Sequence, residues 1–137
     1  MNPLLPDVDL IVAAALREGL PQATVRVLWP DDWADHLPLI VVRQVAGGSA
    51  DRRGIGVAVI DVQCADSDRR NASALARTAR TVIAGACISQ FSGPGGYLNR
   101  FADVTGGPYE IRTGTPESGP DLYRYQATYR VTVRPLT

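Results

Sequence analysis

The apolar residues near the start of the chain recur at helical spacing between Asp7 and Pro21. They are Val8, Ile11, Val12, Ala15 and Leu16. This spacing predicts an amphipathic helix with one buried face. Asp7 can cap the free backbone N–H groups, or Asp9 can favour the positive end of the helix dipole. Gly19 and Pro21 are typical of a helix end, so we expect the chain to change direction there.

A second apolar stripe at helical spacing follows the segment Asp66-Ser67-Asp68. The stripe consists of Ala72, Leu75, Ala76, Ala79, Val82, Ile83 and Ala86. It predicts a second helix, with Ser67 or Asp68 as its cap. Because the stripe is rich in alanine, this helix can lie close to a sheet. Ser92-Gly93-Pro94-Gly95-Gly96 predicts a turn beyond the helix.

Alternating or continuous apolar runs in the rest of the chain predict β-strands. We expect them at 23–29, 39–45, 55–64 and 97–104, with a short edge piece at 109–112. Residues 39–42 are apolar on both faces, which is typical of a covered strand near the centre of a sheet. The connection 46–54 is too short for a helical crossover, so it predicts an antiparallel hairpin with a projecting tip.

The last strand, 122–134, has the clearest pattern in the chain. One face carries Tyr123, Tyr125, Ala127, Tyr129, Val131 and Val133, and the other carries Arg124, Gln126, Thr128, Arg130, Thr132 and Arg134. The first face predicts packing against a helix layer, and the second must meet water or a polar partner. The element order is then α-β-β-β-α-β-β. This order favours one α+β domain over residues 1–137, in which two helices pack on one side of a mainly antiparallel sheet.

Composition and charge exclude several classes of protein. With 137 residues, 45% hydrophobic, the chain resembles an ordinary globular domain rather than a disordered tail or a disulfide scaffold. Fourteen basic residues balance fourteen acidic ones, so no global attraction to nucleic acid or to an anionic membrane is expected. No apolar run approaches the roughly 20 residues that cross a bilayer. Cys64 and Cys87 lack the spacing of a zinc or redox motif and predict small buried residues.

The search for catalytic chemistry yields few candidates. His36, the only histidine, is a possible general base with Asp35 to orient it, but no nucleophile accompanies it. Two groups of carboxylates, Asp31/Asp32/Asp35 and Asp61/Asp66/Asp68, lack the spacing of a calcium loop, and solvated loops and helix caps explain them better. The glycine-rich stretches match no phosphate-binding motif. We therefore expect neither an enzyme nor a cofactor or metal site.

Three further groups of residues favour contacts with other molecules only weakly. The pairs Arg52-Arg53 and Arg69-Arg70 allow a small nucleic-acid-binding α+β domain, although such domains usually carry a basic face. Tyr123, Tyr125 and Tyr129 predict core residues rather than a surface on which bases stack. Trp29 and Trp33 flank an acidic turn and either anchor that loop or form a contact surface.

The order and spacing of these segments resemble the tail terminator, or tail completion, proteins of long-tailed phages, including the minor tail protein U type. The resemblance covers most of the chain. It begins with the first helix and Leu20-Pro21, and continues through the strand 39–45 with Gly47-Gly48, the strand 55–64 and the second helix. The segment 124–135, Arg-Tyr-Gln-Ala-Thr-Tyr-Arg-Val-Thr-Val-Arg-Pro, carries most weight.

The resemblance implies a virion protein that assembles in the host cytoplasm as a hexameric ring at the head-proximal end of the tail. The ring would cap the tail tube, end its polymerisation, meet the head-completion or connector protein, and let DNA pass through its lumen without specific binding. A related alternative is another head–tail joining or neck protein. The family offers no catalytic motif to transfer. We expect subunit or tube contacts at Asp51, Arg52 and Arg53 on the hairpin tip, and at Arg124, Thr128 and Arg130 on the last strand. The loop 113–120 departs from the family pattern.

Overall fold

A computed structural model describes residues 6–47, 55–111 and 122–136 of the chain. Two α-helices and seven strands lie within these ranges, with a short 3-10 turn between the first two strands. The elements are α1 (Val8–Gly19), β1 (Thr24–Arg26), η1 (Trp33–His36), β2 (Leu39–Gly47), β3 (Gly56–Asp66), α2 (Arg69–Ile88), β4 (Ser92–Gly93), β5 (Gly96–Asp103), β6 (Tyr109–Ile111) and β7 (Tyr123–Pro135).

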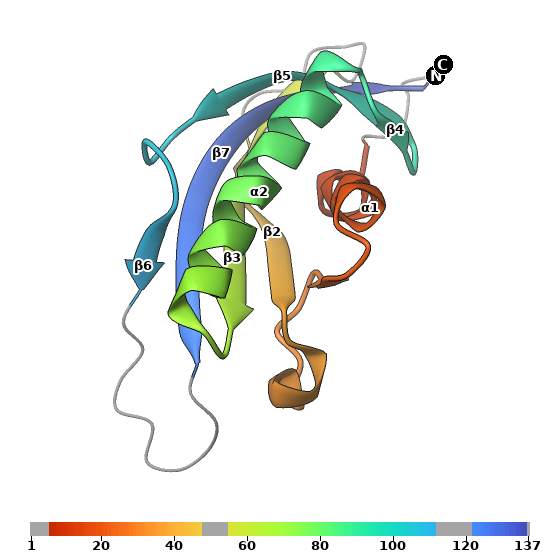
Figure 1. Cartoon of the computed structure of the whole chain (residues 1–137). Coiled ribbons are helices and arrows are strands. Elements are labelled where there is room, and N and C mark those ends of the chain that lie inside the picture. The colour runs from red at the N-terminus through yellow and green to blue at the C-terminus, as the bar shows by residue number, and fades with distance from the viewer. Residues whose placement is uncertain (1–5, 48–54, 112–121, 137) are drawn as a thin grey trace.

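The strands form one sheet in the order β1-β2-β3-β7-β5-β4, and β6 pairs with the first part of β7. Every pair is antiparallel except β1 and β2, which run parallel. Figure 1 shows both helices on the same side of the sheet, and β7 curves around α2. The α+β class, the antiparallel hairpin of β2 and β3 and the placement of the helices are therefore confirmed.

Short polar side chains begin both helices as the sequence predicts. The carboxylate of Asp7 accepts a hydrogen bond from the backbone N–H of Leu10 at 3.3 Å. Asp68, rather than Ser67, caps α2 and accepts from the N–H groups of Arg70 and Asn71. Each cap satisfies backbone donors that have no partner inside the helix.

The core lies between the helices and the sheet, and β7 contributes alternate residues to it. The tyrosines of this face are buried as predicted, with Tyr125 at 9% and Tyr129 at 1% exposure. Tyr129 also contacts Phe101 of β5, with 5.1 Å between the ring centroids. Because β7 pairs with β3 along eleven residues and with β5 and β6 on its other side, it is the central strand of the sheet.

Two strand predictions differ from the structure. The strand predicted at 23–29 is only Thr24–Arg26, because β1 lies at the edge and pairs with β2 alone. The turn predicted at 92–96 contains a two-residue strand, β4, which pairs with the start of β5. Gly96 fits there because a Cβ would lie 2.6 Å from the carbonyl oxygen of Arg134.

Both cysteines are free and buried, as predicted. Burial raises the pKa of the Cys87 thiol to about 11 and raises that of Cys64 as well, so both thiols are protonated at neutral pH. Among the described helices, none combines the length and the apolar character needed to cross a membrane.

Candidate assembly interface

One face of the sheet is turned away from α1 and α2, and we call it the open face. On β7 it carries Arg124, Gln126, Thr128, Arg130, Thr132 and Arg134. Strand register adds residues of the neighbouring strands to the same face: Asp61 lies beside Thr128, Gln63 beside Gln126 and Arg100 beside Thr132. The face predicted to meet water or a polar partner thus carries polar side chains on β3, β7 and β5, whereas toward β2 it also holds the buried Leu39 and Val41.

A hydrogen-bonded group of side chains occupies the middle of the open face. The carboxylate of Asp61 is 7% exposed and accepts from Nε2 of Gln126 at 2.6 Å and from Nε2 of Gln63 at 3.3 Å. The side-chain oxygen of Gln63 in turn accepts from the guanidinium of Arg124. These amide donors stabilise a carboxylate that burial would otherwise penalise.

Trp29 covers one end of this group. The guanidinium carbon of Arg124 lies 4.4 Å from the centroid of the Trp29 ring, which is a cation–π contact. Burial lowers the pKa of Arg124, while the charge of Asp61 acts in the opposite direction. Trp29 therefore anchors the segment after β1 to the start of β7, which confirms one of its two predicted roles.

The remaining arginines of the open face have no carboxylate partner among the described residues. Arg43, Arg100, Arg130 and Arg134 make no ion pair within the part of the chain that the structure describes. Arg43, Arg100 and Arg130 are exposed, whereas Arg134 is half-buried. The Nε atoms of Arg124 and Arg134 are buried and lack a hydrogen-bond acceptor. The exposed guanidinium groups of Arg43, Arg100 and Arg130 are thus donors that an acceptor on another molecule can satisfy.

The structure brings together three of the six residues predicted as contacts. Arg124, Thr128 and Arg130 all lie on the open face, with Arg124 and Thr128 half-buried and Arg130 exposed. Asp51, Arg52 and Arg53 lie outside the described residues. Sequence reasoning missed the group around Asp61, and it interpreted Asp61 as a loop or cap residue, which is wrong because Asp61 lies in the middle of β3. The signal was present in the last strand, where Gln126 faces away from the core.

Comparison of the sequence with known protein families shows to which family the chain belongs. Residues 4–137 match the family described as phage tail termination protein. The chain belongs to this family. A search of the curated proteins found no match. The predicted resemblance is thereby confirmed at the level of the family.

Tail termination is a structural role. The contacts of His36 in this phage tail termination protein are those of a turn residue. Nε2 of His36 lies 3.0 Å from Oδ2 of Asp32, so the carboxylate bonded to the imidazole is Asp32 and not Asp35, which the sequence offered as a possible orienting residue. Both residues belong to the turn at η1, where the four-residue spacing brings them together. The hydrogen bond from His36 lowers the pKa of Asp32. Among the described residues, no three His, Cys, Asp or Glu side chains are grouped as metal ligands.

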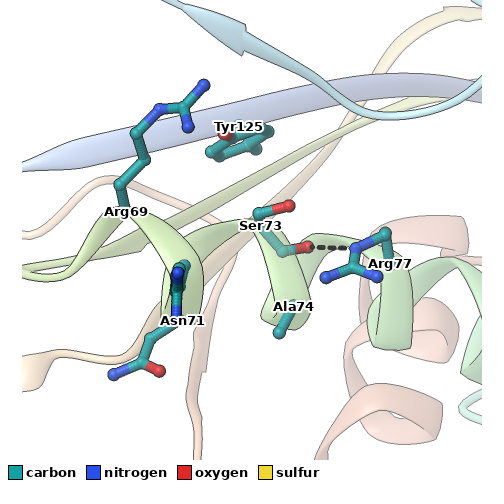
Figure 2. Close-up of a pocket in the computed structure, with 7 residues that line it drawn as sticks. Arg69, Asn71, Ser73, Ala74, Arg77 and Tyr125 are labelled. Atoms are coloured by element: carbon teal, nitrogen blue, oxygen red, sulfur yellow. Dashed lines mark hydrogen bonds between the residues drawn. The ribbon is translucent and has the colours of Figure 1, made fainter.

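A shallow groove of about 460 Å³ runs along the first half of α2 (Figure 2). It is lined by Arg69, Arg70, Asn71, Ser73, Ala74, Arg77 and Tyr125. Arg69 pairs with Glu110 at 2.8 Å, and Nε of Arg77 donates to the backbone oxygen of Ser73. Because one of its three arginines is already neutralised, the groove gives only weak support to the nucleic-acid alternative.

Proposed function

We propose that this tail termination protein forms a hexameric ring at the head-proximal end of the phage tail. The ring caps the tail tube, stops its polymerisation and offers a surface to the head-completion or connector protein. The observation that carries the proposal is the family match over residues 4–137, nearly the whole chain. The whole chain, residues 1–137, then acts as a single terminator domain. Assembly takes place in the host cytoplasm, and DNA passes through the ring without specific binding.

The open face supports this proposal because it suits contact with protein. Arginine is enriched at interfaces, since its planar guanidinium binds carboxylates through two hydrogen bonds. A chain with balanced charge can supply those carboxylates from its own copies. We propose Arg124, Thr128 and Arg130 as contact residues of the ring, and Asp51, Arg52 and Arg53 as contact residues toward a neighbouring subunit or the tube.

Native mass spectrometry over a concentration series tests the ring, with the same samples viewed by negative-stain electron microscopy. The expected result is a six-subunit ring with an open centre, formed by the protein alone or on purified tail tubes. Phage lacking the protein should produce tubes without a uniform length. A chain that stays monomeric alone and on tubes, together with uniform tubes in its absence, would contradict the proposal.

The variant Arg52→Glu/Arg53→Glu tests the hairpin contact separately. We expect it to block assembly while the melting temperature stays nearly unchanged, because exposed charges contribute little to folding stability. Ring formation by this variant at the wild-type concentration would remove these two residues from the interface without affecting the proposed role of the protein.

A further inference from the structure

Two groups of like charge lie at different ends of the sheet. Exposed carboxylates gather at Asp31, Asp32 and Asp35, around the turn η1 between β1 and β2. Three arginines gather where β7 ends, with Arg130 and Arg134 on β7 and Arg100 on β5. We call the first group the acidic turn and the second the arginine patch.

The two groups lie at opposite corners of the molecule. The acidic turn precedes β2 at the β1 edge, level with the start of β7, because Leu39 pairs with Ala65 and Ala65 with Arg124. The arginine patch starts six residues further along β7 and extends onto β5, which amounts to roughly 20–30 Å at the rise of a β-strand. Figure 1 shows the orange turn at the lower end of the molecule and the C-terminus at the upper end.

Neither group is fully neutralised by the charges that the structure describes. Asp31 and Asp35 make no ion pair within the described ranges, and Asp32 pairs only with His36. In the arginine patch, Arg100 and Arg130 are exposed, and Nε of Arg134 is buried without an acceptor. Among the described residues, the arginine patch therefore has no carboxylate partner, and Asp31 and Asp35 have no cationic one.

We infer that the arginine patch of one subunit binds the acidic turn of the next copy of this chain. This inference rests on the proposed ring and names the contact that closes it. A cyclic ring needs two different surfaces on each subunit, and opposite charges at opposite corners satisfy that requirement. Complementary charge also fixes which surfaces meet and suppresses wrong pairings.

DNA is the other anionic partner to consider for the arginine patch. A second copy is favoured because the neutral chain gives no long-range attraction to a polyanion. The arginine patch has three arginines, and the acidic turn of the same chain has three carboxylates. A duplex would instead be held by more basic residues than this face provides.

Charge reversal of each surface gives a sharp test. Variant one is Arg100→Glu/Arg130→Glu, and variant two is Asp31→Arg/Asp35→Arg. Both variants should fold, because all four replaced side chains are exposed. Each alone should place like charges together and raise the concentration needed for half-assembly by at least about tenfold. The control Arg70→Glu/Arg77→Glu reverses two exposed arginines of α2 and should assemble like wild type.

Mixing the two variants is the decisive step. In an alternating ring, the reversed patch of variant one meets the reversed turn of variant two, and the remaining contacts are wild-type pairs. Assembly should therefore return in an equimolar mixture and only as rings with equal numbers of each variant. A single chain carrying all four substitutions should also assemble. Native mass spectrometry resolves these species by mass.

The outcomes separate this inference from the proposed function. Wild-type rings together with unimpaired rings of both variants would overturn the inference alone. Rings of variant one that have lost affinity for short duplex DNA at low salt would overturn it in favour of a DNA contact. Variants that fail alone and remain unassembled in the mixture would also overturn it. A wild-type chain that is monomeric alone and on tubes would contradict the proposed function and the inference together.

Discussion

Strand β7 contributes alternate residues to two faces of one sheet, and the two faces are stabilised in different ways. Toward the helices, Tyr129, Val131 and Val133 are almost fully buried among apolar side chains. Toward the open face, Gln126 and Arg124 are half-buried and make hydrogen bonds to side chains of β3. The first face gains free energy from the removal of apolar surface from water, whereas the second must match each donor with an acceptor.

The difference teaches where a partner can bind. A face that buries its apolar side chains is complete within one chain and leaves nothing for a neighbour. On the open face, the side chains around Asp61 satisfy one another by hydrogen bonds, whereas the exposed Arg100 and Arg130 make no ion pair among the described residues. Stability and assembly are therefore carried by opposite faces of the same strand, and substitutions on each face should separate the two properties.

The largest expected effect is on the helix-covered face. Tyr129→Ala removes a ring that is 1% exposed and in contact with Phe101. The free energy of unfolding should fall by about 3–5 kcal/mol, as for other large aromatic residues in cores. Tyr109→Ala is the matched control, because Tyr109 is 46% exposed and its strand β6 places it beside Gln126. Urea denaturation measures both, and equal losses would contradict the contrast between the faces.

An intermediate effect is expected at the centre of the open face. Asp61→Ala leaves the amide donors of Gln126 and Gln63 without their acceptor, which should cost about 1–3 kcal/mol of unfolding free energy. Asp61→Asn keeps an acceptor oxygen at the same position and should lose less. Denaturation of Asp61→Ala, Gln126→Ala and the double variant Asp61→Ala/Gln126→Ala measures the coupling of the pair. Strictly additive losses would show that the hydrogen bond contributes nothing.

The period of two along β7 explains why both of its faces were predictable. Alternation assigns Tyr125 and Tyr129 to one side and Arg124 and Gln126 to the other without any knowledge of the neighbouring strands. The helix caps were predictable for a similar reason, since Asp68 and the donors it binds are within three residues of one another. Local geometry sets such features, and the sequence carries local geometry directly.

The register between strands was not predictable in the same way. Asp61 meets Gln126 across 65 residues of chain, and a shift of one residue would have turned Asp61 toward the helices. The same limit explains Trp29, whose contact with Arg124 depends on the path of the segment after β1. The turn at η1 decides that His36 bonds to Asp32 and not to Asp35, and the alternation pattern does not specify the shape of this turn.

The smallest effect belongs to an ion pair at the rim of the helix-covered face. Arg80 of α2 donates from Nε and Nη2 to the carboxylate of Asp103, and the two side chains are 39% and 28% exposed. The hydrogen bonds from Arg80 lower the pKa of Asp103. A lowered pKa means that the pair stabilises the fold above the unfolded-state pKa of about 3.9 and loses that contribution as the pH falls below it.

The variant Asp103→Asn isolates this charge, because Arg80 keeps its contact with the Phe101 ring at 5.4 Å. At pH 7 the variant should be less stable than wild type by under about 1 kcal/mol, since solvent screens a partly exposed pair. The difference should become smaller between pH 7 and pH 2, because the wild-type carboxyl group takes up a proton as the pH falls through its lowered pKa. Thermal denaturation at both pH values measures it. A difference that persists unchanged at the lower pH would mean that Asp103 stabilises the fold through packing rather than through its charge. Asp103 would then act like the apolar side chains beneath the helices, and not like Asp61, whose carboxylate acts through hydrogen bonds.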